Sequence, residues 1–192
     1  LSLAVHTPAA PTISVITVCF NSADTLAEAL QSVADQTWPH IEHILIDGAS
    51  RDGTPAILEH FRPHLSHVVS EPDKGIYDAM NKGLALSSGE IVCFLNADDR
   101  YASPRVLADV ARLMAEHKVD VLMGDVAFFH PDNPAKVVRR YRSNRFRPEL
   151  LAYGWMPAHP ALFMRHDVVR RVGMFKTNYK IAGDFDFIAR AF

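Results

Sequence analysis

The chain has 192 residues, of which 48% are hydrophobic and 22% charged, and its formal net charge is −2. These values indicate an ordinary soluble globular protein with one core, and they exclude a global basic field that would attract nucleic acid. Cys19 and Cys93 each fall inside an expected buried strand, so we interpret them as apolar side chains in a reducing, cytoplasmic compartment. Residues 1–11 lack the pattern of a signal peptide, and no apolar run approaches the length needed to cross a bilayer.

Apolar segments alternate with helical patterns along the first half of the chain. The alternation predicts an α/β fold with a mainly parallel central sheet, flanked by helices and joined by right-handed crossovers. Asn21 or Ser22 is expected to cap the first helix. The four strands are predicted at 13–20, 43–47, 67–70 and 91–95.

The pattern changes in the second half of the chain. A helix is expected to start at Ser103 and Pro104. Two strands, 121–129 and 137–141, are expected to form a small antiparallel pair around a turn at 130–134. An irregular loop at 154–160, a short helix at 167–172 and the opening of another helix at 182–190 complete the prediction.

The segment GEIVCFLNADDRY places oxygen-bearing side chains at the carboxyl edge of the sheet, where ligands bind in open α/β folds. Asn96, Asp98 and Asp99 follow the fourth strand directly. Carboxylates so close together repel unless a cation is shared, and Mg²⁺ or Mn²⁺ prefers oxygen ligands and bridges to phosphate oxygens. The alternative is an Asx-rich turn that leads into the next helix.

Further polar residues are predicted to reach this edge from the first two strands. Asp47 ends the second strand and is placed to accept from a base N–H or a ribose hydroxyl, while Thr17, Asn21 and Asp52 line the same mouth. The alternative for Asp47 and Asp52 is turn chemistry, because Asp-Gly pairs favour tight turns. Neither GxGxxG nor GxxxxGK[ST] is present, so we expect recognition to rest on side chains and a metal.

The loop after the third strand is another candidate for the pocket. Asp73, Lys74 and Gly75 lie beside a helix N-terminus, where anions are favoured. Asn81 lies further along that helix, on a polar face that it shares with Lys82. For Lys82 the favoured interpretation is an ion pair on a solvated face.

Two candidates lie near the C-terminus. Asp184 and Asp186 are two residues apart on an expected helix, so only one of them faces a pocket. A carboxylate opposite a metal-bound diphosphate is suited to act as a general base, and the alternative is an N-cap aspartate. His159 is a candidate metal ligand or substrate contact, although a core or surface histidine is the favoured interpretation.

One local basic cluster stands out against the acidic net charge. It is expected to face anionic lipid, a phosphate-bearing acceptor or solvent, and the solvated face is the favoured interpretation. Its members are Lys136, Arg139, Arg140, Arg142, Arg145 and Arg147.

Together these motifs resemble the family-2 glycosyltransferases over about 12–190. Residues 17–21 resemble the family's first-strand motif, 47–54 its uridine-contacting loop, and 182–187 the A-x-D-Y-D-L run that carries the base. Residues 159–163 resemble its His-containing acceptor-side segment. Residues 96–99 are similar to its metal-binding DxD, but Asn96 replaces the first aspartate, which removes one formal charge and keeps an oxygen acceptor.

The resemblance implies a single GT-A domain at 12–192 after a tail at 1–11, with a nucleotide-sugar half at 12–100 and an acceptor half at 101–192. It also leaves open that part of an acceptor lid, or a membrane-associating tail, is missing after Phe192. The implied activity is that of an inverting, metal-dependent hexosyltransferase of cell-surface polysaccharide synthesis. Its donor is a UDP- or GDP-linked sugar, its acceptor a hydroxyl of a glycan or lipid-linked molecule, and its cofactor Mg²⁺ or Mn²⁺.

The same resemblance assigns roles to individual residues. Asp98 maps to the metal ligand and Asp184 to the catalytic base, while Asp99 and His159 are metal or acceptor contacts. The expected nucleotide contacts are Thr17, Asn21, Asp47, Asp52, Asp73, Lys74, Gly75, Asn81, Asn96 and Ala97.

Other classes of protein remain as alternatives. A nucleotidyltransferase also uses a metal at a parallel sheet edge, but the first strand is not followed by a Gly-rich, basic triphosphate loop. A receiver-like signalling domain needs acidic residues after the first strand, where Cys19-Phe20-Asn21 provides none. A catalytically silent nucleotide-sugar-binding domain differs from the enzyme only in turnover. Peripheral association with the inner face of a membrane also stays open.

Overall fold

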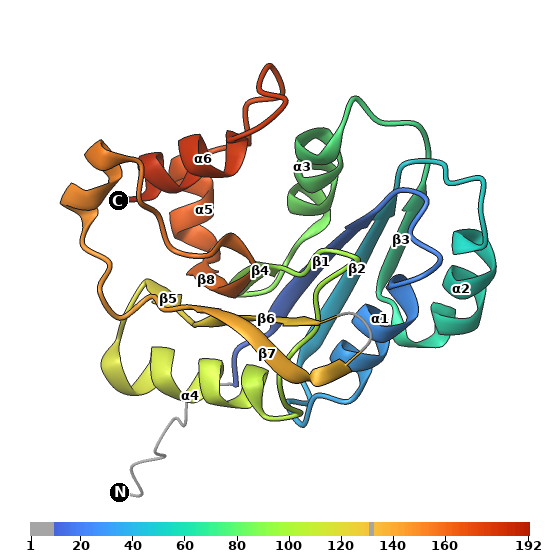
Figure 1. Ribbon diagram of the computed structural model, residues 1–192, viewed down its shortest axis with the longest axis horizontal. Helices are drawn as coiled ribbons and strands as arrows, with labels where there is room; N and C mark the ends of the chain where they lie inside the picture. The colour runs from blue at the N-terminus through green and yellow to red at the C-terminus, as the bar shows by residue number, and fades with distance from the viewer. Residues whose placement is uncertain (1–9, 131–132) are drawn as a thin grey trace, which may run out of the picture.

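A six-stranded sheet in the order β3-β2-β1-β4-β8-β5 forms the middle of the molecule (Figure 1). The computed structural model describes residues 10–130 and 133–192, so most of the predicted tail at 1–11 lies outside the described residues. The strands of the sheet are β1 Ile13–Cys19, β2 Ile41–Asp47, β3 His67–Ser70, β4 Ile91–Phe94, β5 Val121–Met123 and β8 Leu162–Arg165.

The four strands predicted in the first half are confirmed as parallel neighbours. β1 pairs in parallel with both β2 and β4, and β2 pairs in parallel with β3. Because these strands share one direction, their carboxyl ends lie at the same edge of the sheet. The loops that follow β1, β2, β3 and β4 are therefore brought together at this edge.

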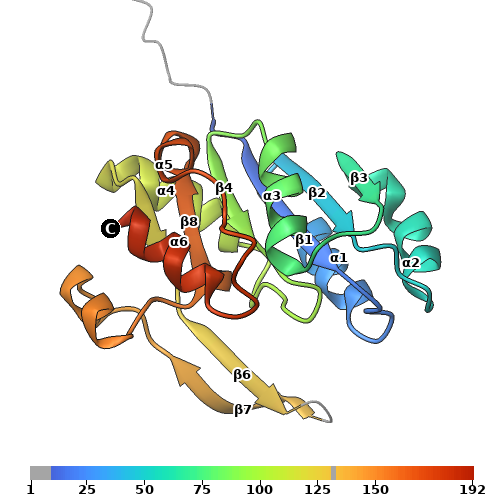
Figure 2. The same cartoon turned by 90° about the horizontal axis from the view of Figure 1, so that it is seen from above.

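Helices cover both faces of this sheet (Figure 2), which explains why its strands are apolar without alternation. Ile16 of β1 packs in a cluster with α3 and α6, whereas its neighbour Val15 packs in a cluster with α1 and α4. The helices are α1 Leu26–Ala34, α2 Thr54–Phe61, α3 Ile76–Leu86, α4 Val106–His117, α5 His166–Val172 and α6 Gly183–Ala191, with 3-10 turns at Arg62–His64, Pro148–Tyr153 and His159–Ala161.

The predicted single strand at 121–129 is wrong, because the chain changes sheets within it. β5 ends at Met123, and β6 Val126–His130 pairs with β7 Asn133–Tyr141 in a separate antiparallel sheet. Hydrogen bonds fix the break: the Gly124 N–H donates to the Ala161 carbonyl at 2.8 Å, and Asp125 Oδ1 accepts from the Ser143 N–H at 2.9 Å. The predicted antiparallel pair is confirmed, while the middle of its turn lies outside the described residues.

The position of β8 has no counterpart in the prediction. β8 runs antiparallel between β4 and β5, so a strand from the end of the chain completes the central sheet. Its first residue follows the turn that holds His159, and this places His159 beside the end of β4.

Two helix starts also differ from the prediction. The N-cap of α1 is Thr25 rather than Asn21 or Ser22, and Asn21 instead adopts a left-handed conformation with φ of 49°. Helix α4 begins at Val106 rather than at Ser103 or Pro104. The reason is tertiary, because the carbonyls of Ser103 and Pro104 accept hydrogen bonds from the loop after α1.

Candidate active site at the carboxyl edge of the sheet

A cleft of about 600 Å³ opens at the carboxyl edge of the parallel strands. Three segments line it: the end of β1 with the loop that follows, the loop before α3, and the acidic loop after β4. The predicted site residues among its lining are Asn21, Asp73, Gly75, Asn96, Ala97 and Asp98.

The acidic loop divides its side chains between two cavities. Asn96 and Asp98 line the edge cleft, whereas Asp99 lines a second cavity behind the loop. The Asp99 N–H donates to the Asn96 carbonyl at 3.0 Å, so the loop is indeed a tight turn. Burial, together with the nearby charge of Asp98, raises the pKa of Asp99 to about 6. The expected repulsion between these carboxylates is therefore present.

Asn96 presents an unpartnered oxygen. Its Oδ1 is buried and has no hydrogen-bond partner within the described part of the chain. A buried polar atom without a partner is costly, so such an atom in a cleft indicates a ligand. Asp98 lies two residues further along the same lining.

The side chain of Asp73 packs against Gly48, the first residue after β2. A Cβ built on Gly48 would lie 2.6 Å from Asp73 Oδ2, so only glycine leaves room for this carboxylate. Asp73 Oδ1 accepts from the Gly75 N–H at 2.8 Å, and Gly75 has a positive φ of 115° that favours glycine. Gly48 thus leaves space for the Asp73 carboxylate, and the Gly75 N–H orients it in the lining of the cleft.

The loop after β1 is joined to the loop after β2. Asn21 Oδ1 accepts from the Arg51 N–H at 2.9 Å, and the Asn21 N–H donates to Ser50 Oγ at 2.8 Å. Asp52 accepts from the N–H groups of Ala23 and Thr54, both at 3.0 Å. The hydrogen bonds from Thr54 and Ala23 lower the pKa of Asp52, so this exposed carboxylate connects the loop after β1 to the first residue of α2.

Asp47 and Thr17 are buried beneath the cleft and are not part of its lining. Asp47 accepts from Ser50 Oγ at 2.5 Å and from Ser70 Oγ at 2.6 Å. Thr17 Oγ1 lies 3.0 Å from His43 Nε2. The turn chemistry named as the alternative for Asp47 and Asp52 is therefore present, and nucleotide contact by Asp47, Asp52 or Thr17 stays a prediction.

The polar residues of α3 have structural partners. Asn81 accepts from the Phe175 N–H at 2.8 Å and donates to its carbonyl at 2.9 Å, which fastens the segment before α6 to α3. Lys82 pairs with Glu71 at 2.8 Å, as expected for a solvated face. Lys74 is exposed and donates its backbone N–H to Asp78. Neither Lys74 nor Asn81 lines the cleft.

Asp184 lies in the first turn of α6 and contacts α3. Its Oδ1 accepts from Tyr77 Oη at 3.3 Å and from the Phe185 N–H at 2.9 Å. Gly183 permits this approach, because a Cβ there would lie 2.7 Å from the Tyr77 ring. Tyr77 lies on α3, whose residues Ile76 and Ala79 line the cleft, whereas Tyr77 and Asp184 are not part of its lining.

Asp186 points to a different set of partners. It forms ion pairs with Lys176 at 2.7 Å and with Arg190 at 2.9 Å. Burial opposes the shift, but these two hydrogen-bonded cations lower the pKa of Asp186. The N-cap of α6 is Ala182, so Asp184 is not its N-cap residue.

His159 is a core histidine. Its ring stacks on Phe94 with the centroids 5.2 Å apart, and its Nε2 is buried with no partner among the described residues. Burial lowers the pKa of His159 to about 4, although the charge of Asp184 acts in the opposite direction. The imidazole is therefore neutral near pH 7 and lies within the field of Asp184.

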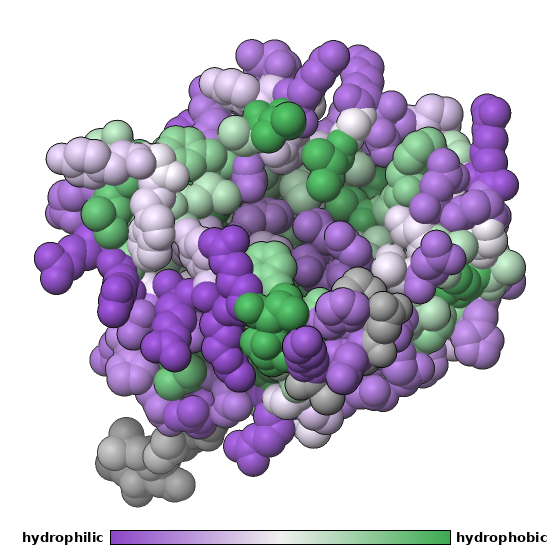
Figure 3. All heavy atoms as spheres, in the orientation of Figure 1, coloured by the Kyte–Doolittle hydropathy of each residue, from purple (hydrophilic) through white to green (hydrophobic). Residues whose placement is uncertain are grey.

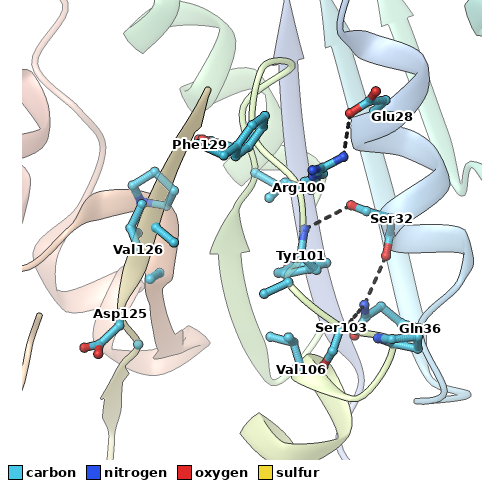
Figure 4. A pocket seen from close by; sticks show the side chains of 18 of the residues that line it. Glu28, Ser32, Gln36, Arg100, Tyr101, Ser103, Val106, Asp125, Val126 and Phe129 are labelled. Carbon is cyan, nitrogen blue, oxygen red and sulfur yellow. Dashed lines mark hydrogen bonds and ion pairs between the residues drawn. The ribbon is translucent and has the colours of Figure 1, made fainter. Parts of the chain in front are cut away.

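The second cavity has a volume of about 850 Å³ and lies between α1, the segment 99–106 and the β6–β7 sheet. Figure 4 shows how side chains of α1 fasten its wall: Glu28 pairs with Arg100 at 2.8 Å, and Ser32 Oγ accepts from the Tyr101 N–H at 3.2 Å. Sequence reasoning did not predict this cavity, because its three walls meet only in the folded chain.

The donors of the edge cleft fit a hard cation that is only partly coordinated by protein. Within residues 10–130 and 133–192, no three His, Cys, Asp or Glu side chains are grouped to hold a metal ion. Asp98 and the unpartnered Asn96 oxygen are ligands of the kind that Mg²⁺ or Mn²⁺ accepts when phosphate oxygens complete its shell.

A mainly parallel sheet flanked by helices, with a separate small antiparallel pair, defines the class of protein, the GT-A fold. Residues 14–173 match the model of the family Glycosyl transferase family 2, and the chain belongs to this family. An uncharacterized glycosyltransferase of Mycobacterium tuberculosis is 38% identical over 185 residues, which cover 95% of this chain and 69% of that relative. A PGL/p-HBAD biosynthesis glycosyltransferase of Mycobacterium bovis is 34% identical over 194 residues, covering 96% and 71%.

Solved structures confirm the fold. TarS of S. aureus superposes with a TM-score of 0.76 at 26% identity, and the match covers 94% of this chain but only 33% of TarS. A shorter TarS chain, residues 1–349 in complex with UDP, gives a TM-score of 0.75 at 25% identity and covers 92% of this chain and 54% of that one. The chain thus spans about a third of full TarS.

Proposed function

We propose that this chain is an inverting glycosyltransferase that moves a sugar from a nucleoside-diphosphate sugar to a hydroxyl of a glycan or lipid-linked acceptor in cell-surface polysaccharide synthesis. One observation carries the proposal. A cleft lined by Asp73, Asn96 and Asp98 also takes part of its lining from α3, and Tyr77 of the same helix donates to Asp184. In this proposal the cleft takes the nucleoside diphosphate, and Asp184, bound to the same helix, supplies the carboxylate.

UDP is the favoured nucleotide, and GDP is the alternative. The TarS structure that contains UDP shares 25% of its residues with this chain. In the cleft, Phe20 and Ile76 are 62% and 46% exposed and offer apolar surface on which a base can pack. Asp73 offers acceptor oxygens for a base N–H or a ribose hydroxyl.

Mg²⁺ or Mn²⁺ is the proposed cofactor, held by Asp98 with Asn96 Oδ1. Asparagine lowers the charge of the ligand set relative to aspartate, but its carbonyl oxygen is still a hard ligand. When bound, the cation offsets the negative charge that accumulates on the diphosphate leaving group.

Asp184 is the proposed general base. Its Oδ1 is already occupied by two donors, and Oδ2 has no hydrogen-bond partner among the described residues. Oδ2 therefore accepts the proton of the acceptor hydroxyl as that oxygen attacks the anomeric carbon. The bond from the anomeric carbon to the diphosphate breaks on the opposite face, so one displacement inverts the configuration.

Calorimetric titration with UDP, GDP and NAD, in the presence of Mn²⁺ or EDTA, tests the donor half of this proposal. We expect UDP to bind with Mn²⁺ and to lose that binding in EDTA. The proposal is contradicted if NAD binds more tightly than UDP, or if the affinity for UDP is the same with EDTA as with Mn²⁺. A catalytically silent domain gives the same titration as the enzyme, so release of UDP in the presence of a donor and an acceptor distinguishes the two.

A further inference from the structure

The β6–β7 sheet, together with residues 142–147, forms a basic ribbon that projects from the body of the molecule (Figures 1 and 2). Its base is fastened by the Tyr141 hydroxyl, which donates to the Met156 carbonyl at 2.5 Å, and by the Ser143 N–H on Asp125. On its inner side, Phe129 lies under the Arg100 guanidinium at 4.5 Å and lines the second cavity. The ribbon is therefore held in a defined position.

Apolar side chains are exposed on the other side of the ribbon. Phe128 is 48% exposed and Val138 is 56% exposed, and neither lines a cavity of the described chain. Arg139 lies over the Phe128 ring at 5.7 Å. Figure 3 shows this side as hydrophobic side chains over the ribbon, bordered by hydrophilic ones.

The ribbon concentrates positive charge that the protein leaves uncompensated. Over the span of the ribbon, 126–147, the sequence contains six lysine and arginine residues and one acidic residue, Asp132, although the whole chain has 20 basic and 22 acidic residues. Elsewhere in the chain, acidic residues therefore outnumber basic ones. Within the described part of the chain, no side-chain hydrogen bond or ion pair involves Arg140, Arg142, Arg145 or Arg147.

We propose that the basic ribbon docks on an anionic phospholipid surface. Exposed apolar side chains interleaved with arginines suit the headgroup region of a bilayer, where the apolar groups insert and the cations meet lipid phosphates. A soluble phosphate ligand instead needs a concave site. Arg140 lines the second cavity, but Arg139, Arg142, Arg145 and Arg147 line neither cavity and spread along the exposed strand and the segment after it. None of the helices in the described chain is long and apolar enough to cross a membrane.

Docking of this kind has a consequence that rests on the proposed function. The ribbon borders the cavity behind the acidic loop, and that loop also lines the donor cleft. A ribbon bound to lipid thus holds the donor cleft near the membrane surface, where a lipid-linked acceptor presents its hydroxyl. Binding of the ribbon to lipid does not require sugar transfer, so a lipid-binding experiment can fail or succeed independently of the proposed reaction.

Sedimentation with vesicles tests the proposal. The chain is mixed with vesicles of phosphatidylcholine alone, or of phosphatidylcholine and phosphatidylglycerol in equal parts. We expect binding to the anionic vesicles only, and weaker binding as salt is added. The double variant Arg139→Gln/Arg142→Gln should bind about 25-fold more weakly, at about fivefold for each lost charge. Phe128→Ser should also reduce the bound fraction.

The matched control is Arg62→Gln/Arg170→Gln, which removes two exposed arginines outside the ribbon and should leave vesicle binding unchanged. Unchanged thermal unfolding shows that each variant is folded. Equal binding to neutral and anionic vesicles, or an equal loss in the control and ribbon variants, overturns the proposal. Displacement from vesicles by low concentrations of soluble glycerol phosphate also overturns it, because the ribbon would then be a site for soluble phosphate.

Discussion

The hydroxyl of Tyr77 donates to Oδ1 of Asp184 at 3.3 Å, across 107 positions of sequence. This contact joins α3, whose N-terminal end lines the edge cleft, to α6, which carries the proposed base. Burial and the charge of Asp184 raise the pKa of Tyr77, so its hydroxyl stays protonated and remains a donor. Tyr77 is thus a positioning residue for the carboxylate.

Tyr77→Phe should lower kcat about tenfold and leave the Kd for UDP unchanged. A hydrogen bond to a charged group is worth about 1.5 kcal/mol, and its loss frees the Asp184 side chain to leave the productive orientation. Steady-state kinetics combined with UDP titration separate the two effects. A variant that loses UDP affinity while retaining kcat shows that Tyr77 supports the cleft instead.

Gly48→Ala should weaken UDP binding about tenfold. The new Cβ would lie 2.6 Å from Asp73 Oδ2, so the carboxylate must shift from its present position in the cleft. The size of the effect corresponds to the loss of one charge-assisted hydrogen bond. Gly124→Ala is the matched control, because its Cβ would meet Ala161 at an ordinary 3.4 Å. If both alanine variants bind UDP equally well, Asp73 makes no donor contact.

Asp98→Asn should abolish the dependence of UDP binding on Mn²⁺, with affinity reduced at least tenfold, because the cleft loses its charged metal ligand. Asp99→Asn provides the comparison, since Asp99 lines the second cavity. It should bind UDP and Mn²⁺ within a few-fold of the parent chain. Titration of each variant with UDP, with and without Mn²⁺, decides the matter, and the reverse ranking assigns the metal to Asp99.

The stability of the protein should fall as the solution is acidified, in part through His43. Burial lowers the pKa of His43 to about 3, whereas an unfolded histidine titrates near 6.5. The unfolded chain therefore binds more protons, so the contribution of neutral His43 is complete above pH 6.5 and is lost as the pH falls toward 3. The loss is roughly 1 kcal/mol per pH unit.

Urea unfolding at pH 7 and pH 5 measures this dependence, with His43→Gln as the comparison. Glutamine can keep the contact with Thr17 Oγ1 but does not titrate. The free energy of unfolding of the variant should therefore change less between the two pH values. Identical changes in the parent and the variant contradict the account of His43 as a neutral buried group.

The parts of the fold that could be predicted from the sequence are those in which the residues of the segment itself determine its structure. β1 and β4 are buried throughout and mostly apolar because both of their faces are covered, and such runs are recognisable without tertiary information. β8 is different, because a four-residue segment becomes a strand only when β4 and β5 accept it. The break at Gly124 depends likewise on Ala161 and Ser143, which are far along the chain.

The candidate site likewise contains residues whose positions follow from local sequence and residues whose positions depend on tertiary contacts. Asn96, Asp98 and Asp73 line the cleft as predicted, because the end of a parallel strand fixes where the next loop lies. Thr17 and Asn81 do not line it, since His43 and Phe175 engage their side chains. The role of Tyr77 was not predicted, although it lies in a segment singled out from the sequence, because its partner Asp184 is brought close only by α6.

The most direct test of the proposed mechanism compares turnover in Asp184→Asn and Asp186→Asn. Both variants change one carboxylate to an amide on α6, but Asp186 faces Lys176 and Arg190 rather than Tyr77. With a UDP-linked sugar and an acceptor, Asp184→Asn should transfer 10²- to 10⁴-fold more slowly while it still binds UDP, as loss of a general base requires. Asp186→Asn should keep most of its activity. Transfer by Asp184→Asn at a rate near that of the parent would contradict the assignment of Asp184 as the base.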